Sequence, residues 1–344
     1  MLNNIKILLL ILVLLAAATY FVVQQDQSTE AGDNEWLLPE LQQNINQISR
    51  IELKRQNDVV SLEQKESGWV VAEASGFYAN KENIVGLLMN LRSVVLLEKK
   101  TSNSDNFERL DLLDSAVSIK LHQGDQLLKS VLIGKDSSTG QGTFVRYADV
   151  QQAWLASKIN PINVRIDQWL QNRIIDIDAE NVSAVRLKQV ETGELIEIQR
   201  TLAAEAEAFR MANIPEGQEL MENANVGGLA NGLANYMIDQ AEPRDVDNLT
   251  HTIELTYDIT SGLRYLINVY ALNDVYYATV DVQQGLAGTQ LTPEAALEMQ
   301  TVNQRFADWM FVIPSYKFNA VNKTPADYLQ SATTEAVTTE DNAG

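Results

Sequence analysis

Apolar and polar positions alternate in two stretches of the chain that also match each other in sequence. Residues 48–54 read ISRIELK and residues 182–188 read VSAVRLK, a separation of 134 positions. Side chains of a strand point alternately to opposite faces, so this period of two predicts a half-buried strand in each stretch. Residues 118–121 (SIKL) and 252–255 (TIEL) match at the same separation. The pattern therefore predicts an internal repeat.

Between these strands the apolar period lengthens to that of a helix. Asn80 is a suitable N-cap, and residues 86–91 (GLLMNL) correspond to residues 228–233 (GLANGL) in the second half. Each half is therefore predicted to contain strands, then one helix, then an antiparallel meander. This order predicts the α+β fold class, built from two tandem related strand-helix-meander repeats. The apolar positions on one face of the first helix are Ile84, Leu87, Leu88, Leu91, Val94 and Val95.

The start of the chain differs from the rest, because the run from Ile7 to Val23 carries no charge. Its length is near the lower limit for a helix that crosses a bilayer, so residues 1–23 are predicted to be a transmembrane signal anchor that contacts lipid through residues 5–23. Lys6 precedes the run, whereas Asp26 and Glu30 follow it, which predicts a cytoplasmic N-terminus and a periplasmic bulk at the bacterial inner membrane. Cleavage after Ala18 is the alternative.

The remaining boundaries follow from composition. We expect a polar linker over residues 24–44, a first α+β repeat over 45–175 and a second over 176–320. A C-terminal extension with a disordered tail should occupy residues 321–344, since the last residues are rich in Thr, Glu and Ala. Within these divisions, residues 36–39 (WLLP) form a candidate docking element, and a helix is expected from Pro293 to about Met310.

Charge and cysteine content exclude some classes of function. The chain has 46 acidic and 26 basic residues, a net charge of −20, and no cysteine. An acidic surface repels phosphate backbones, so nucleic acid is not expected as a partner. Without cysteine, disulfides and thiol chemistry are absent.

Two histidines are the first candidates for catalytic chemistry. His122 and His251 each fall on or beside a predicted strand, without a second histidine or cysteine at ligand spacing. A catalytic triad or zinc site would then need partners brought in from distant parts of the chain. We expect both to be structural residues at strand edges, and we expect the protein not to be an enzyme.

Two glycine-rich stretches resemble ligand loops only weakly. Residues 134–142 (GKDSSTGQG) lack the GxxxxGK[ST] order of a phosphate loop and precede a strand, which favours a hairpin turn. Gly227, Gly228 and Gly232 fall in the second predicted helix, where small residues favour close packing.

Acidic pairs and tryptophans complete the set of candidate binding residues. Asp176 with Asp178, and Asp245 with Asp247, lack the loop pattern of a calcium site. Three tryptophans could stack a ligand, although core packing is the preferred interpretation: Trp69, Trp154 and Trp169. No catalytic, cofactor-binding or metal residue is therefore assigned, and no cofactor is expected.

The order of elements resembles a bacterial family catalogued as domain of unknown function 4340. The resemblance extends over residues 45–320 and is carried by Gly68-Trp69, by Ala79-Asn80 before the helix, and by residues 132–135 (LIGK) before Phe144-Val145. Residues 169–176 (WLQNRIID) resemble the family's passage between its halves. The resemblance implies an N-terminal anchor, an extracytoplasmic body and an association with ABC transporters of the gliding-motility type, and no activity.

Two functional hypotheses follow. The first is a non-enzymatic extracytoplasmic accessory subunit, anchored in the inner membrane and working with an ABC-type permease. The second is a periplasmic ligand-binding module with a groove between the two repeats.

Overall fold

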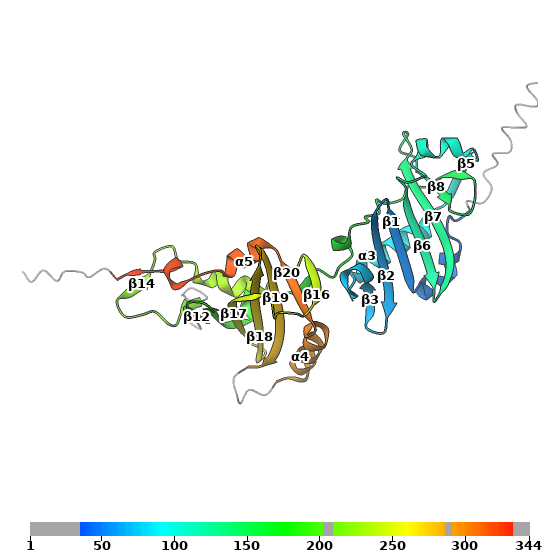
Figure 1. Ribbon diagram of the computed structural model, residues 1–344. Helices are drawn as coiled ribbons and strands as arrows, with labels where there is room; N and C mark the ends of the chain where they lie inside the picture. The colour runs from blue at the N-terminus through cyan, green and yellow to red at the C-terminus, as the bar shows by residue number, and fades with distance from the viewer. Residues whose placement is uncertain (1–34, 202–208, 286–290, 333–344) are drawn as a thin grey trace, which may run out of the picture. The chain divides into compact units, whose positions relative to one another are not determined.

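The computed structural model describes residues 35–201, 209–285 and 291–332, which divide into two compact units (Figure 1). The first unit takes its described residues from the chain up to Glu73 and from Ala79–Trp169. The second takes them from Ala74–Tyr78 and from the chain that begins at Leu170. An antiparallel sheet forms the centre of each unit, and the two units are described separately.

Eight strands of the first unit pair in the order β3-β2-β1-β6-β7-β8-β9-β5. Ile51 pairs with Leu121 and Leu53 with Ile119, and all four side chains are buried, whereas the polar residues between them face away. This alternation is typical of an antiparallel sheet with one packed face and one solvated face. The strands are β1 (Arg50–Arg55), β2 (Asp58–Lys65), β3 (Gly68–Val71), β5 (Leu96–Thr101), β6 (Val117–Gln123), β7 (Gln126–Asp136), β8 (Thr143–Tyr147) and β9 (Ala153–Ala156).

Helix α3 (Lys81–Ser93) contributes to the core of this unit. The side chain of Asn80 accepts hydrogen bonds from the backbone N–H groups of Glu82 and Asn83, so the predicted N-cap is confirmed. Burial of each large aliphatic side chain stabilises the unit by roughly 1.5–3 kcal/mol. The buried residues of the helix are Ile84, Leu87, Leu88 and Leu91.

The segment that precedes β1 packs into the first unit. Leu37 donates its backbone N–H to the Val94 carbonyl oxygen at 2.9 Å, and the hydroxyl of Tyr147 donates to the Leu37 carbonyl oxygen at 2.6 Å. Leu37, Leu38 and Leu41 are almost fully buried, the last of them in helix α2 (Glu40–Asn44). Of the expected docking element at residues 36–39, Leu37 and Leu38 are thus part of this core, whereas Trp36 and Pro39 are exposed. Burial also raises the pKa of Tyr147 to about 12.

The second unit contains a sheet in the order β13-β12-β11-β17-β18-β19-β20-β16. Strands β17, β18 and β19 are ten residues each, and every second residue along most of β17 and β18 is buried. The strands of the sheet are β11 (Val182–Gln189), β12 (Leu195–Arg200), β13 (Phe209–Met211), β16 (Gln240–Pro243), β17 (Thr250–Ile259), β18 (Leu263–Leu272), β19 (Val275–Gln284) and β20 (Trp309–Ile313). The remaining strands are β4 (Phe77–Tyr78), β10 (Arg173–Ile175), β14 (Gln218–Leu220), β15 (Tyr236–Met237) and β21 (Leu329–Ser331).

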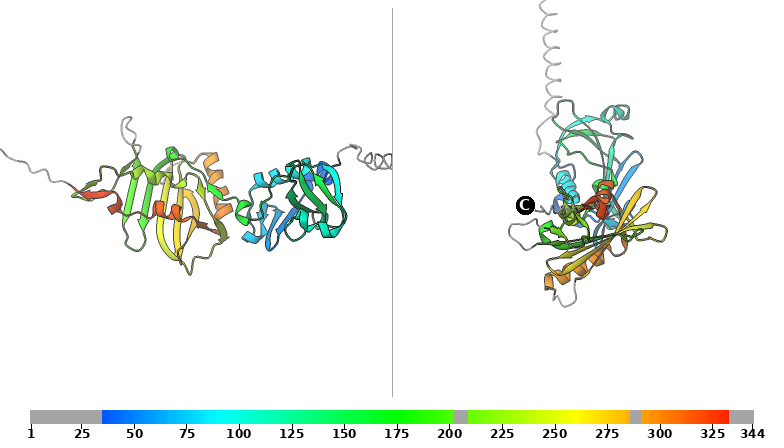
Figure 2. Two further views of the ribbon diagram at one scale, coloured as in Figure 1. Left: turned by 90° about the horizontal axis from the view of Figure 1, so that it is seen from above. Right: turned by 90° about the vertical axis from the view of Figure 1, so that its left-hand side faces the viewer.

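Helices of the second unit pack on its sheet (Figure 2). Helix α4 (Pro293–Phe306), capped by Thr292, and helix α5 (Ser315–Val321) both contact β19. The hydroxyl of Tyr265 donates to a carboxylate oxygen of Glu298 in α4 at 2.5 Å. The 3₁₀ helices of the two units are η1 (Ile45–Gln47), η2 (Ala72–Ala74), η3 (Ser104–Asn106), η4 (Glu108–Leu110), η5 (Ile166–Gln168), η6 (Ala179–Asn181), η7 (Val226–Leu233) and η8 (Pro325–Asp327).

Both sheets have the same topology. In each, an initial set of three antiparallel strands pairs through its first strand with a later meander, β1 with β6 and β11 with β17. At the far edge of each sheet lies a strand from the segment between the two sets, β5 directly after α3 and β16 after η7 and β15. Residues 48–54 and 182–188, which match in sequence, therefore occupy equivalent strands.

The fold class predicted from the sequence is wrong. Strands account for 43% of the described residues and helices of all types for 24%, so the protein is mostly antiparallel sheet rather than α+β. The second predicted helix is the 3₁₀ helix η7 and not an α-helix. Gly227, Gly228 and Gly232 lie in this short segment, and glycine in a helix interior is unfavourable by about 1 kcal/mol relative to alanine.

The membrane-spanning part of that prediction is not supported by the described residues. None of the helices among residues 35–201, 209–285 and 291–332 is long and apolar enough to cross a bilayer. The predicted anchor at residues 1–23 lies outside the described residues, as do most of the predicted disordered tail and the first part of the predicted linker. Residues 329–331 form β21, which pairs with β14.

The contact between η7 and β17 gives a test of how the second unit packs. In Gly232→Ala the added methyl group would overlap the hydroxyl oxygen of Tyr257, whose side chain is buried. We expect this substitution to lower the free energy of unfolding by about 1–3 kcal/mol, measured by urea denaturation. Gly228→Ala is the control, because its methyl group would lie 3.5 Å from the nearest atom, on Asn225. Equal stability of the two variants would contradict the packing described here.

Candidate functional site

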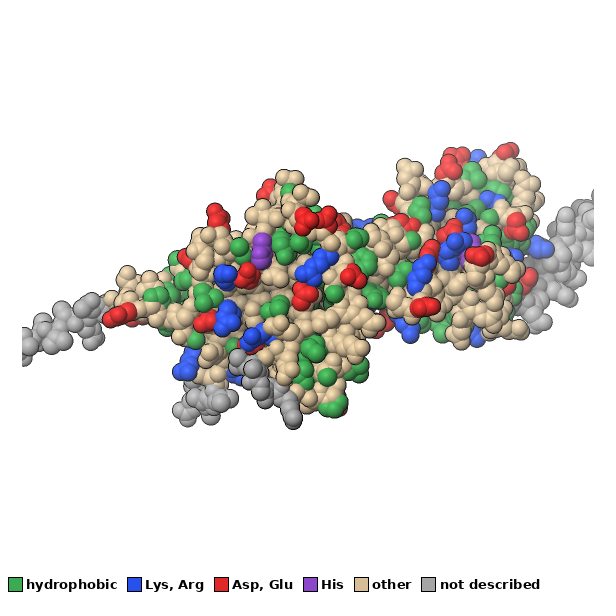
Figure 3. Space-filling view, turned by 60° about the horizontal axis from the view of Figure 1, so that its bottom comes forward, with side chains coloured by type: hydrophobic (Ala, Val, Ile, Leu, Met, Phe, Trp, Pro, Cys, Tyr) green, Lys and Arg blue, Asp and Glu red, His purple; other side chains and the backbone are tan. Residues whose placement is uncertain are grey.

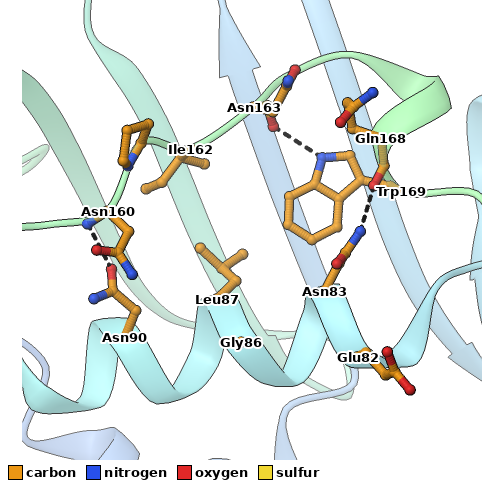
Figure 4. A pocket seen from close by; sticks show the side chains of 11 residues that line it. Glu82, Asn83, Gly86, Leu87, Asn90, Asn160, Ile162, Asn163, Gln168 and Trp169 are labelled. Atoms are coloured by element: carbon orange, nitrogen blue, oxygen red, sulfur yellow. Dashed lines mark hydrogen bonds between the residues drawn. The ribbon is translucent and has the colours of Figure 1, made fainter.

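A cavity of about 300 Å³ opens in the first unit between α3 and the connection that follows β9 (Figure 4). Two side-chain bridges hold this connection against the helix. Asn83 donates through Nδ2 to the Gln168 carbonyl oxygen at 2.8 Å, and Asn90 accepts through Oδ1 from the Asn160 backbone N–H at 3.1 Å. Along the helix axis the two bridges are roughly 10 Å apart. The cavity is the space between them.

Apolar groups line the middle of the cavity. Gly86 and Leu87 lie on the helix between the two bridges, and Ile162 and Trp169 come from the connection (Figure 4). The Trp169 ring is 5% exposed, and its Nε1 donates to the Asn163 carbonyl oxygen at 2.9 Å, which fixes the orientation of the indole. A Cβ atom at Gly86 would meet no atom within 4 Å, so open space lies above the helix backbone at this point.

The polar groups that surround this apolar floor are mostly amides. Asn163 accepts through Oδ1 from the backbone N–H of Arg165, and Gln168 donates through Nε2 to Asp167. Each of these amides therefore uses one of its two functions within the protein. The other functions have no hydrogen-bond partner among the described residues: Nδ2 of Asn90, Nδ2 of Asn163, Oε1 of Gln168 and the side-chain amide of Asn160.

Electrostatically the cavity is close to neutral. Glu82 is the one ionisable residue that lines it, and this residue is exposed in the first turn of α3. A carboxylate at that place interacts favourably with the positive end of the helix dipole. The cavity thus presents hydrogen-bond donors and acceptors around an apolar floor, a combination that is typical of ligand pockets.

The three tryptophans considered as a stacking shelf are not brought together. Trp69 lies on β3 and Trp154 on β9, and five strands separate β3 from β9 in the sheet. Trp154 contacts Tyr147 edge-to-face at 5.3 Å between ring centroids. Trp169 alone of the three lines the cavity. Its place in the cavity was not predicted from the sequence, because its neighbours in the cavity come from helix α3, far earlier in the chain.

The amides of the cavity were missed in the sequence analysis. Asn83, Gly86 and Asn90 are spaced by three and four residues, which places them on one face of a helix. A glycine between two asparagines on an exposed helix face is a signal that could have been noticed. Their convergence with Asn160 and Gln168 depends on the path of the connection, which the sequence pattern does not specify.

His122 belongs to a cluster of charged residues on the solvated face of the first sheet. Its Nδ1 lies 3.1 Å from Nη2 of Arg50, and its Nε2 lies 3.3 Å from a carboxylate oxygen of Glu52. Lys120 is 3.0 Å from the other Glu52 oxygen. Arg50 can only donate, so Nδ1 is the acceptor and the proton of the neutral ring is on Nε2, facing Glu52. The strand that carries His122 lies between β1 and β7, so it is not an edge strand.

Electrostatics in this cluster favour the neutral imidazole. Burial, and then the charge of Arg50, hold the pKa of His122 below its ordinary value, although Glu52 acts in the opposite direction. Burial of Glu52 opposes ionisation, yet Lys120, His122 and Arg50 together lower the pKa of its carboxyl group. The nearby Ser49 hydroxyl interacts with the His122 carbonyl oxygen and the Gly124 N–H, and not with the ring. The cluster is therefore a network of interacting charged and polar side chains on the surface of the sheet.

The other sequence candidates have structural roles in the described part of the chain. His251 lies on β17, between β11 and β18, and its ring stacks on Tyr270 at 4.8 Å. Of residues 134–142, the first three end β7 and residues 137–142 connect β7 to β8, which agrees with the predicted hairpin turn. Asp176 pairs with Arg173 at 3.1 Å and accepts from the Asn235 N–H, and Asp245 accepts from the Asp247 N–H. Among the described residues no group of three or more His, Cys, Asp or Glu side chains is arranged to hold a metal ion.

A second, larger hollow lies on strands of the second unit. It covers about 600 Å³ over the solvated face of β11, β12, β17 and β18. Four of its five charged side chains form ion pairs, Arg186 with Glu197 at 2.6 Å and Arg264 with Asp258 at 2.6 Å, and the fifth, Arg200, donates to the backbone carbonyl oxygens of Val182 and Ala179. Figure 3 shows positive and negative side chains interspersed over the molecular surface. The hollow is therefore lined by one more basic than acidic side chain, whereas the one charged residue that lines the first cavity is acidic.

Comparison with known proteins identifies one family. Residues 69–251 match the family model described as "Domain of unknown function (DUF4340)". The matched range includes every residue that lines the cavity of the first unit. No curated protein and no solved structure matches the chain.

The His122 cluster gives a pH-dependent prediction. Because the pKa of His122 is lowered in the folded protein, the unfolded chain binds a proton below about pH 6.5 that the folded chain does not. The free energy of unfolding should therefore fall as the pH decreases from 7.5 to 5.5, by at most about 1.4 kcal/mol per pH unit from this group. Urea denaturation of His122→Gln should show a smaller slope over this range. His251→Gln retains His122 and should keep the slope of the wild type, and equal slopes in all three proteins would contradict the assignment.

Proposed function

The chain belongs to the family described as domain of unknown function (DUF4340), and we propose that it is a non-enzymatic accessory subunit that works outside the cytoplasm beside an ABC-type permease. The family match covers residues 69–251 and carries no activity with it. The resemblance described above links such proteins to transporters of the gliding-motility type. The proposal therefore assigns to this chain a role in binding rather than in catalysis.

The observation that carries the proposal is the chemistry of the cavity beside α3. Its lining consists of amides, apolar side chains and one exposed carboxylate, Glu82. General acid–base catalysis needs a titratable group placed against the reacting atoms, and nucleophilic catalysis needs an activated nucleophile. The lining contains no serine, threonine, lysine or histidine. Such a surface is suited to holding a molecule or a partner segment without changing it.

The N-terminal sequence supports a position at the inner membrane. The uncharged run from Ile7 to Val23, with Lys6 before it and Asp26 after it, favours contact with the bilayer and a periplasmic body. A tether of this kind raises the effective concentration toward a neighbouring membrane protein, up to mM for a short flexible linker. A weak contact between the body and the permease is then sufficient for assembly.

A ligand-binding module that acts without a permease is the second candidate. The cavity of the first unit favours it, because pockets with an apolar floor and convergent polar groups are typical ligand sites. The cavity lies within one unit, whereas the sequence analysis expected a groove between the two repeats. The two candidates differ in whether the protein has a membrane partner.

Purification of the intact protein in a mild detergent, followed by mass spectrometry, tests the accessory role. We expect an ABC-type permease to be recovered with the full-length chain and to be lost when residues 1–23 are deleted. Replacement of Ile7–Val23 by an unrelated apolar run of equal length is the matched control, and it should retain the permease because the tether acts through the bilayer. Recovery of the full-length protein alone would reject the accessory role and favour the independent module.

A further inference from the structure

We propose that the cavity between α3 and residues 157–169 binds a neutral saccharide. This inference concerns the first unit only and does not depend on a permease partner. It rests on three features of the cavity: its unpaired amides, the glycine at its centre and its lack of positive charge.

The unpaired amides match the hydroxyl groups of a sugar. A hydroxyl group both donates and accepts, and an amide side chain presents a donor and an acceptor side by side. The free Nδ2 groups of Asn90 and Asn163 can donate to ring hydroxyls, and Oε1 of Gln168 can accept from them. Asn160 adds one donor and one acceptor. A ligand with few polar groups would leave these amides without partners and would bind weakly.

The positions of the amides are set by the protein before any ligand binds. Asn90 is held by its bond to the Asn160 N–H, and Asn163 by its bond to the Arg165 N–H, while each keeps its Nδ2 group free. The Trp169 ring is fixed by the hydrogen bond from its Nε1. A preorganised site loses less conformational entropy on binding, so modest contacts give measurable affinity.

Gly86 supports the presence of a ligand at the centre of the cavity. This residue is an exposed helix position where a side chain would meet no other atom, so packing does not require glycine. Glycine there costs roughly 0.5–1 kcal/mol of stability relative to alanine. Close approach of a ligand to the helix backbone is one of the uses of glycine that offset this cost. The C–H face of a sugar ring would then lie over Gly86 and Leu87.

The charge of the site selects among ligands. No lysine, arginine or histidine lines the cavity, and the one charged lining residue is Glu82. The chain as a whole carries a net charge of −20. Phosphorylated and carboxylated sugars would be repelled, because no positive charge compensates theirs. The polar lining disfavours purely apolar ligands, since it would be desolvated without new hydrogen bonds.

The test uses the full-length protein in mild detergent and isothermal titration calorimetry. The probes are chitotriose and maltotriose as neutral sugars, glucuronic acid as an anionic sugar, and an uncharged acetylated tripeptide amide. We expect binding of at least one neutral sugar, and no binding of the anionic sugar or the peptide. Absence of binding by both neutral sugars at mM concentration would overturn the proposal, as would tighter binding of the peptide.

Three variants locate the binding site. Gly86→Leu places a side chain in the cavity and should lower the affinity by at least about tenfold, while its thermal stability equals or exceeds that of the wild type because leucine favours the helix. Asn90→Asp keeps the acceptor for the Asn160 N–H, removes the free donor, and should weaken binding severalfold. Val85→Leu enlarges an exposed neighbour on the same helix outside the cavity and should bind as the wild type does. Unchanged affinity in Gly86→Leu would overturn the assignment of the sugar to this cavity.

Discussion

Antiparallel pairing of β1 with β6, and of β11 with β17, is the constraint on which each unit depends. Each pairing joins strands that are more than 60 residues apart in the chain, as in the pairing of Leu53 with Ile119 and of Leu187 with Leu255. Once the pairing is made, the register fixes which side chains face the core, because a shift by one residue would turn every apolar side chain to the solvated face. The intervening segment, which contains α3 in one unit and η7 in the other, must then pack against the sheet, and a later strand of that segment, β5 or β16, lies at the far edge.

The cavity is a consequence of this arrangement in the first unit. The chain that leaves β9 returns alongside α3, where the hydrogen bonds of Asn83 and Asn90 join it to the helix and Ile159, Val164 and Trp169 are buried. Gly86 leaves the space between these bonds open. In the second unit the glycine that corresponds in sequence to Gly86 is Gly228, where a Cβ atom would lie 3.5 Å from the nearest atom, on Asn225. Gly232, one turn later in η7, lies directly against the side chain of Tyr257, so η7 packs closely on β17, whereas the connection after β9 leaves an open cavity beside α3.

Sequence patterns were sufficient for the strands and for local signals. The period of two placed β1, β6, β11 and β17, and Asn80 was correctly identified as an N-cap. The fold class was wrong because a repeat of sequence was taken to imply a repeat of the helix, although the glycines of residues 227–232 favour the shorter η7. The cavity could not be predicted, since the amides of Asn83 and Asn90 meet Gln168 and Asn160 only through tertiary packing. The positions of Trp69 and Trp154 relative to each other could not be predicted from the sequence either, because the two residues lie on strands that are far apart in the sheet.

The central claim is that the first unit is a binding module whose site lies between α3 and the connection after β9. Hydrogen–deuterium exchange of the full-length protein, measured by mass spectrometry with and without a saturating neutral trisaccharide, tests it most directly. A bound ligand reduces the local opening that permits exchange of the amides it covers. The account predicts slower exchange confined to peptides from residues 81–93 and 157–169. Protection confined to the second unit, or no change anywhere at saturation, would contradict it.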